Sequence, residues 1–211
     1  MKKIFILLTL LSIILSGSTS MKYGYKVGDN ATDFKLKNID GNYISMSTNP
    51  DNKGYIIVFT CNTCPWARGY EQRIINLHKK YAPKGFPVIA IQPNDPEVQP
   101  GDSFEEMQKR AEEYNYPYPY VIDAGQAITM AYGATKTPHV YLLEKDGSNY
   151  FVRYIGGIDN SPRDGSLATE KYVEIAIDQL LAGEEVGTTV TKAIGCSIKW
   201  NAAAKAKLGK L

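Results

Sequence analysis

Two cysteines three residues apart, Cys61 and Cys64, are the residues of this sequence best suited to chemistry. They follow a run of β-branched and aromatic residues, and Pro65 comes directly after the second cysteine. Because proline is favoured at the first position of a helix, we expect Cys64 at the N-cap and Cys61 in the connection before it. The unpaired N–H groups and positive dipole end of a helix N-terminus can lower a cysteine pKa from about 8.5 to about 3.5–7.5. The spacing therefore predicts a redox-capable pair with Cys64 as the nucleophile.

The elements on either side of the pair predict a β-α-β unit. Residues 55–60 form an unbroken β-branched and aromatic run of strand length, which is typical of a strand buried on both faces. Apolar residues then recur at helical spacing from Pro65 until Pro83 and Gly85 end the helix. A second buried strand at 86–91 should run parallel to the first. The sequence thus predicts an α/β fold with a central sheet flanked by helices.

The rest of the chain adds shorter elements to this unit. Ser103 and Glu106 make a capping box that predicts a helix through about Tyr114. The remaining expected elements are strands near 34–36, 43–46, 120–122, 140–143 and 150–155 and helices at 126–132 and 170–181. From Gly183 onward the pattern dissolves into a tail, which nevertheless carries Cys196 close to an aromatic residue.

The first twenty residues predict a signal peptide. Lys2 and Lys3 give a basic start, residues 4–15 are almost entirely apolar, and residues 16–18 are small. A stretch of twelve residues is too short to span a bilayer, which needs about 20. We expect residues 1–20 to be removed on export to the periplasm or the medium, where disulfides persist. Residues 21–183 would then form one domain, and residues 184–211 a C-terminal tail.

Composition excludes several classes of protein. The 211 residues are 44% hydrophobic and 22% charged, which is ordinary globular usage. Lys and Arg number 24 against 22 Asp and Glu, so loss of Lys2 and Lys3 leaves a neutral mature chain. A neutral chain has no electrostatic reason to bind nucleic acid or an anionic membrane. Three cysteines are too few for a disulfide scaffold.

At the cysteine pair the chain resembles the thioredoxin-fold redoxins, the group of thioredoxin, TlpA-type and peroxiredoxin-like AhpC/TSA proteins. Phe59 and Cys64 have the spacing of the strand-ending phenylalanine and attacking cysteine of thioredoxins. Residues 27–34 are similar to the redoxin opening, and residues 133–138 are similar to the loop that bears a cis-proline. With Cys-Asn-Thr-Cys-Pro, Thr-Pro-His-Val and a terminal Gly-Cys-Ser-Ile-Lys-Trp, the sequence is similar in particular to a bacterial peroxiredoxin-like subgroup.

The resemblance implies a thioredoxin-like fold with a mixed sheet and an exported thiol–disulfide oxidoreductase without a cofactor. Cys64 would attack a disulfide of a protein or small-molecule partner, in a groove shaped by Thr137, Pro138 and Trp66. Ala67 stands where thioredoxin keeps its resolving cysteine. The resolving thiol is therefore either Cys61 or Cys196, and the sequence leaves both open.

Two alternative functions use the same residues. In a thiol peroxidase, peroxide would convert Cys64 to a sulfenic acid, although peroxiredoxins have a threonine where this chain has Cys61. In a non-enzymatic metallochaperone, Cys61, Cys64, His139 and Cys196 would bind Cu(I) or Zn, because thiolate and imidazole suit these ions. The sequence does not predict the oligomeric state.

Overall fold

A computed structural model describes residues 23–209 of the chain, so the expected signal peptide at residues 1–20 lies outside the described residues. The strands are β1 (Leu36–Asn38), β2 (Tyr43–Ile44), β3 (Gly54–Phe59), β4 (Val88–Gln92), β5 (Tyr120–Ile122), β6 (Lys136–Thr137), β7 (His139–Asp146), β8 (Asn149–Gly156) and β9 (Cys196–Ser197). The α-helices are α1 (Pro65–Tyr81), α2 (Phe104–Glu113), α3 (Ala127–Tyr132), α4 (Tyr172–Leu181) and α5 (Ala202–Leu208).

A mixed sheet of seven strands in the order β2-β1-β5-β4-β3-β7-β8 forms the centre of the fold. Strand β3 runs parallel to β4 and antiparallel to β7, and β4 runs parallel to β5. The predicted parallel β-α-β unit and the mixed sheet are therefore confirmed. Because β3 has a partner on both edges, the loop that carries the two cysteines leaves from the middle of the sheet.

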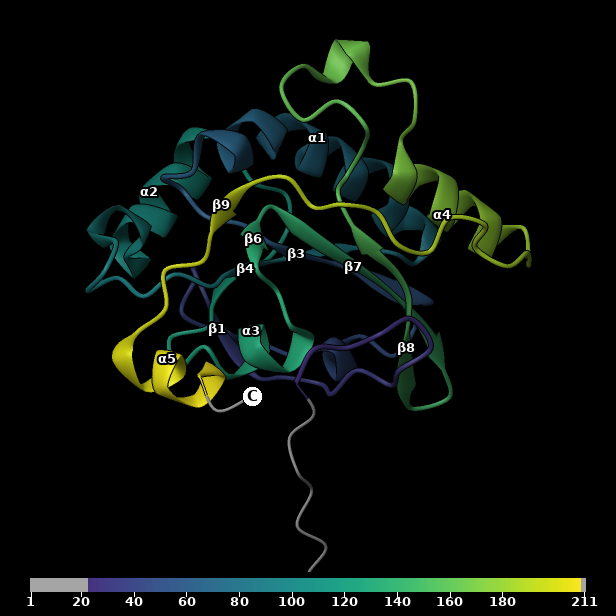
Figure 1. The fold of residues 1–211 in the computed structure, drawn as a ribbon. Helices are drawn as coiled ribbons and strands as arrows, with labels where there is room; N and C mark the ends of the chain where they lie inside the picture. Colours follow the sequence, from purple (N-terminus) through teal and green to yellow (C-terminus); the bar gives the residue numbers. More distant parts are fainter. Residues whose placement is uncertain (1–22, 210–211) are drawn as a thin grey trace, which may run out of the picture.

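Helices cover both faces of this sheet (Figure 1). Helices α1, α2 and α4 lie on one side, and α3 and α5 lie on the other. Successive side chains of a strand point to opposite faces, so Ile56 and Val58 join the core beneath α1 while Ile57 and Phe59 join the core beside α3. All six residues of β3 are buried, as predicted from its unbroken apolar run. The strand that ends at the cysteine loop is thus fixed from both sides.

Local signals in the sequence predicted the helix boundaries well. Helix α1 begins at Pro65 with Cys64 as its N-cap, and Gly85, at φ 93°, follows the turn after its end. The Ser103 hydroxyl accepts a hydrogen bond from the Glu106 N–H at 3.3 Å, which is half of the predicted capping box. These contacts are local in sequence, and short-range rules describe them.

The prediction of an irregular tail is wrong. Residues 189–191 lie along β8, where the Ile155 N–H donates to the Thr189 carbonyl at 2.9 Å and the Thr191 N–H donates to the Ile155 carbonyl at 3.0 Å. Strand β9 then pairs antiparallel with β6, and α5 follows. Figure 1 shows this segment in yellow, crossing the molecule from α4 to α5. Strands of two residues have too few positions to show an alternating pattern, so sequence periodicity could not reveal them.

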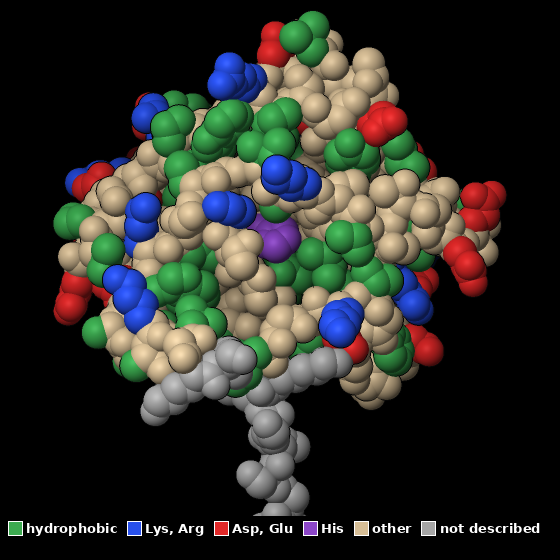
Figure 2. Space-filling view, in the orientation of Figure 1, with side chains coloured by type: hydrophobic (Ala, Val, Ile, Leu, Met, Phe, Trp, Pro, Cys, Tyr) green, Lys and Arg blue, Asp and Glu red, His purple; other side chains and the backbone are tan. Residues whose placement is uncertain are grey.

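The face crossed by the tail carries both signs of charge (Figure 2). Lys and Arg side chains are spread over it among neutral and apolar ones, and Asp and Glu side chains lie toward its margins. This mixed surface agrees with the nearly equal numbers of basic and acidic residues in the sequence.

Candidate active site

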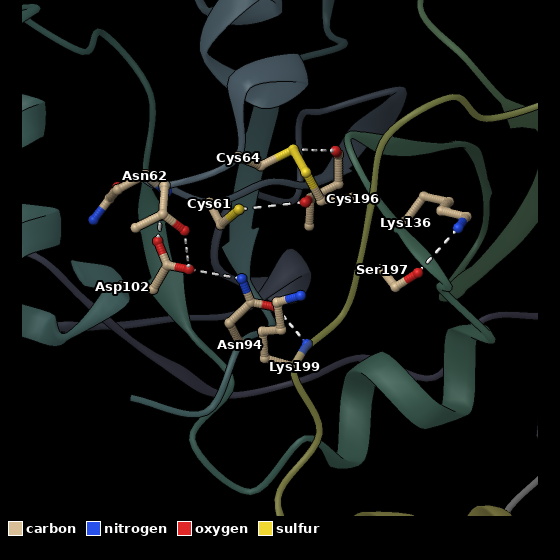
Figure 3. Close-up of a disulfide and its surroundings, with 11 residues drawn as sticks. Cys61, Asn62, Cys64, Asn94, Asp102, Lys136, Cys196, Ser197 and Lys199 are labelled. Carbon is tan, nitrogen blue, oxygen red and sulfur yellow. Dashed lines mark hydrogen bonds between the residues drawn. A yellow bond between two sulfur atoms is a disulfide. The ribbon is translucent and has the colours of Figure 1, made fainter. Parts of the chain in front are cut away.

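A disulfide joins Cys64, at the N-terminus of α1, to Cys196 in β9 (Figure 3). The two residues are 132 positions apart in sequence, and their Cα atoms lie 6.0 Å apart. The pairing of β9 with β6 sets Cys196 opposite Thr137 in the antiparallel register. The Cys64 Sγ atom lies 3.2 Å from the Thr137 carbonyl oxygen. Strand β6 therefore positions both halves of the disulfide.

Cys61 is a free and buried thiol on the other side of Thr137. Its Sγ atom donates a hydrogen bond to the Thr137 Oγ1 atom at 3.3 Å. Burial and the nearby charge of Asp102 raise the pKa of the Cys61 thiol. Because only a thiolate attacks a disulfide, the raised pKa disfavours Cys61 as a nucleophile in this state.

The buried side chain of Asp102 fixes the two residues between the cysteines. Its carboxylate accepts hydrogen bonds from the Asn62 N–H at 2.8 Å, the Thr63 N–H at 3.0 Å and the Thr63 hydroxyl at 3.0 Å. It also accepts a bond from the Asn94 amide at 2.7 Å. The sequence analysis did not single out this residue. The available signal was an acidic residue in the connection that follows a buried strand and precedes the next helix, at the edge of the sheet where the cysteines lie.

The three predicted groove residues lie beside the cysteines. The Thr137–Pro138 peptide bond is cis, as the resemblance implied, and Thr137 is fully buried. Trp66 is half-buried and, like Cys196, packs against the cluster formed by Cys61, Cys64 and Ala67. The guanidinium carbon of Arg163 lies 5.6 Å from the centroid of the Trp66 ring. The structure thus brings together residues from α1, the segment before β7 and the tail.

His139 follows the cis-proline at the start of β7 and is buried. Its Nδ1 atom accepts a hydrogen bond from the Thr135 N–H at 3.4 Å, and its ring centroid lies 4.9 Å from that of Tyr141. Burial lowers the pKa of His139 to about 4, so the imidazole is neutral at pH 7. Within residues 23–209, no three His, Cys, Asp or Glu side chains are grouped to hold a metal ion. The four predicted metal ligands are not assembled as a site in this disulfide-bonded state.

Comparison with protein families identifies the fold around these cysteines. The model of the AhpC/TSA family matches residues 27–153. The chain belongs to the AhpC/TSA family. This match confirms the family resemblance that the sequence motifs suggested, and it includes Cys61, Cys64 and Pro138 but stops before the tail.

The chain is also similar to three other proteins. An uncharacterized conserved protein from Geobacillus kaustophilus is 36% identical, with a TM-score of 0.77 over 84% of this chain and 93% of its own. A thioredoxin family protein from Chlorobium tepidum, a thiol:disulfide interchange protein, is 20% identical with a TM-score of 0.50 over 68% of this chain and 92% of its own, and shares the thioredoxin-like fold. The thiol-disulfide oxidoreductase ResA of Halalkalibacterium halodurans is 26% identical over 122 residues, which are 58% of this chain and 65% of that protein.

Cys64 has two candidate partners, and the one to which it is bonded is Cys196. Among the described residues, no helix is long and apolar enough to cross a membrane.

Proposed function

We propose that this AhpC/TSA family chain is a thiol–disulfide oxidoreductase in which Cys64 is the nucleophile and Cys196 is the resolving thiol. The observation that carries the proposal is the Cys64–Cys196 disulfide at the N-terminus of α1, directly beside the cis-Pro138 bond. The similarity to the ResA oxidoreductase supports the same reaction class.

The reaction begins from the reduced protein. The Cys64 thiolate attacks one sulfur of a partner disulfide, the partner's S–S bond breaks, and its leaving thiolate takes up a proton. The thiolate of Cys196 then attacks the Cys64 sulfur of the mixed disulfide and releases the second partner thiol. Two electrons pass from the protein to the partner, and the protein keeps the Cys64–Cys196 bond. An external dithiol restores the reduced state.

The N-cap position explains why Cys64 is the attacking residue. Cys64 makes no side-chain cap hydrogen bond, and the N–H groups of the first turn of a helix point out of its N-terminus, where Cys64 lies. These groups and the positive end of the helix dipole stabilise a thiolate there, both as nucleophile and as leaving group. Thr137, Pro138 and Trp66 surround it and would shape the surface that the partner meets.

The partner is proposed to be a protein or small-molecule disulfide, and the protein is proposed to act outside the cytoplasm. The basic, apolar and small-residue segments of residues 1–20 support export, and an oxidising compartment suits a chain that carries a disulfide. Mass determination of the amino terminus of the exported protein tests this, because removal of residues 1–20 leaves Met21 first.

Catalytic turnover tests the oxidoreductase proposal. The substrate is a peptide dimer linked by a single disulfide, dithiothreitol supplies the electrons, and release of the free peptide is followed by chromatography. We expect the wild type to accelerate release above the reaction with dithiothreitol alone and Cys64→Ser to give only that background rate. Equal rates for the two proteins would refute the proposal. No contact around Cys64 in residues 23–209 favours peroxide as substrate, so peroxide consumption is the parallel control reaction.

A further inference from the structure

The tail that carries Cys196 is held by contacts that do not involve the disulfide. Three residues after Cys196, the Lys199 N–H donates to the Asn94 Oδ1 atom at 2.9 Å. The Lys199 carbonyl accepts hydrogen bonds from the Asp95 N–H and from the Gln126 side-chain amide, both at 2.9 Å. The Asn201 N–H donates to the Gln126 Oε1 atom at 2.8 Å. All four bonds use backbone groups of the tail, so they fix its register rather than its side chains.

The contacts of Asn94 leave only its Oδ1 atom to accept a hydrogen bond from the tail. Its side-chain NH₂ group donates to the Asp102 carboxylate at 2.7 Å, and its backbone N–H donates to the Gln92 side-chain oxygen. Because carboxylate oxygens accept hydrogen bonds, the NH₂ group must face Asp102 and the Oδ1 atom must face Lys199. Asn94 is almost completely buried, which excludes water as a competing partner.

The same Asp102 carboxylate holds the cysteine loop through the N–H groups of Asn62 and Thr63. Figure 3 shows the resulting chain of contacts, which runs from the loop before Cys64 through Asp102 and Asn94 to Lys199. One buried carboxylate therefore sets the position of the nucleophile and, through one amide, the position of the tail.

Gln126 makes a second anchor of the same kind. Its side chain is fully buried and also donates to the Pro93 carbonyl at 2.7 Å. Its backbone has φ 56°, in the left-handed region that residues other than glycine adopt uncommonly. The surrounding hydrogen bonds hold it there, which leaves its amide fixed toward Lys199 and Asn201.

Apolar contacts and the other end of the tail complete the attachment. Ile198 and Ala204 are buried, and Ile198 packs in the core on the α3 side of the sheet. Before Cys196, the Thr191 hydroxyl accepts a bond from the Gly157 N–H at 3.1 Å, and the Thr191 N–H bonds to β8. The tail is thus fixed on both sides of Cys196 by groups that reduction of the disulfide leaves unchanged.

We propose that Asn94, Asp102 and Gln126 are positioning residues that keep the tail docked when the disulfide is reduced, so that Cys196 stays beside Cys64 as a resident resolving thiol. This inference rests on the proposed function and specifies how its second step is organised. A docked thiol attacks the mixed disulfide as a preoriented intramolecular group, and the ordering of the tail is already complete before the bond forms.

The direct test needs no substitution in the three residues. Amide hydrogen exchange by NMR is measured on the wild type under oxidising conditions, on the wild type in excess dithiothreitol, and on Cys196→Ser. We expect the Lys199 and Asn201 amides of the reduced wild type and of Cys196→Ser to exchange at least 100-fold more slowly than in an unstructured peptide. Exchange at the unstructured rate in both would overturn the proposal, because the tail would then be released on reduction.

A second test measures the positioning effect itself. Equilibration in glutathione buffers gives the effective concentration of Cys196 toward Cys64 in the wild type, Asn94→Ala, Gln126→Ala and Gln126→Glu. We expect a decrease of at least tenfold in both alanine variants and at least as large a decrease in Gln126→Glu, whose buried carboxylate would face the Lys199 and Pro93 carbonyl oxygens without a proton to donate. Gln108→Ala is the control, since it removes a side-chain amide that donates to a backbone carbonyl, that of Ile39, outside the tail, and it should stay within twofold of the wild type.

The results of these two tests and of the turnover assay distinguish failure of the tail-docking proposal from failure of the oxidoreductase proposal. Unchanged effective concentration in variants that retain the wild-type circular dichroism would contradict the positioning role, whether or not the protein turns over disulfides. Protected tail amides in a reduced protein that lacks turnover would contradict the proposed function and leave the docking of the tail in place.

Discussion

Cys64 lies between two other cysteines whose surroundings differ. Cys61 is three residues away in sequence, buried, hydrogen-bonded to the Thr137 hydroxyl and raised in pKa. Cys196 is 132 residues away and yet shares a disulfide with Cys64. Strand pairing accounts for the difference, because β6 and β9 bring Cys196 opposite Thr137. In this structure, backbone register and burial rather than closeness in sequence determine which cysteine is bonded to Cys64.

The two sides also differ in what holds them. The Cys61 side is part of the rigid β3–α1 connection and is fixed by the sheet and by Asp102. The tail side depends on a short strand pair and on hydrogen bonds from Asn94 and Gln126. Variants on each side should therefore separate the two roles.

Cys64→Ser removes the sulfur that both sides share and should have the largest effect. We expect the rate of disulfide turnover to fall by about 10³-fold or more, to the background rate, because a serine hydroxyl cannot form the mixed disulfide. The peptide-dimer assay with dithiothreitol measures this. Turnover above background in Cys64→Ser would mean that another sulfur can start the reaction.

Cys196→Ser removes only the cysteine of the tail and should lower the free energy of unfolding of the oxidised protein. Without the crosslink, the unfolded chain regains the entropy of a 132-residue loop, so the free energy of unfolding of the oxidised protein should fall by about 4–5 kcal/mol. Urea unfolding monitored by circular dichroism gives this value. Wild type in dithiothreitol is the matched control and should unfold at nearly the same urea concentration as Cys196→Ser; a large gap between them would contradict this explanation.

His139 tests the packing next to the cis-proline through the pH dependence of stability. The folded protein lowers the pKa of His139 from 6.5 to about 4, so the unfolded chain binds the extra proton between these values. Above pH 6.5 the imidazole is neutral in both the folded and the unfolded chain, so its burial does not lower the free energy of unfolding. As the pH falls from 6.5 toward 4, the unfolded chain gains a proton that the folded chain does not bind, and the free energy of unfolding falls by about 3 kcal/mol. Urea unfolding across this range should show that His139→Asn lacks this part of the decline. Parallel pH profiles for the two proteins would show that His139 is not titrating as described.

Cys61→Ser should have the smallest effect. Because Cys61 is free and its thiol is favoured in the protonated form, we expect the variant to form the Cys64–Cys196 disulfide and to turn over disulfides within about twofold of the wild type. Peptide mapping after differential alkylation identifies the bond. If Cys61→Ser accumulates an unresolved mixed disulfide, Cys61 rather than Cys196 is the resolving thiol.

The parts of the site that the sequence predicted are those with local signals. Pro65 predicted the helix start and the N-cap position of Cys64, and both are confirmed. The apolar run at 55–60 predicted a strand buried on both faces, and β3 is such a strand. The cis bond before Pro138 came from the family resemblance rather than from any physical pattern, and it is also confirmed.

The remaining parts of the site depend on contacts between distant segments. Asp102 reaches the cysteine loop across 39 or 40 residues, and Asn94 reaches Lys199 across 105. Gln126 contributes through a side chain that looks, in the sequence, like an ordinary residue before a short helix. No periodicity or capping rule describes such pairs, so the ordered tail and its anchors could be found only in the folded structure.

Trapping the mixed disulfide tests directly whether Cys64 attacks and Cys196 resolves. Reduced wild type, Cys196→Ser and Cys61→Ser are each mixed with a stoichiometric disulfide-linked peptide, quenched with acid, and analysed by intact mass and peptide mapping. We expect a stable peptide adduct on Cys64 in Cys196→Ser, and the Cys64–Cys196 bond without an adduct in the other two proteins. An adduct on Cys61, or a Cys61–Cys64 bond in place of the adduct in Cys196→Ser, would contradict it.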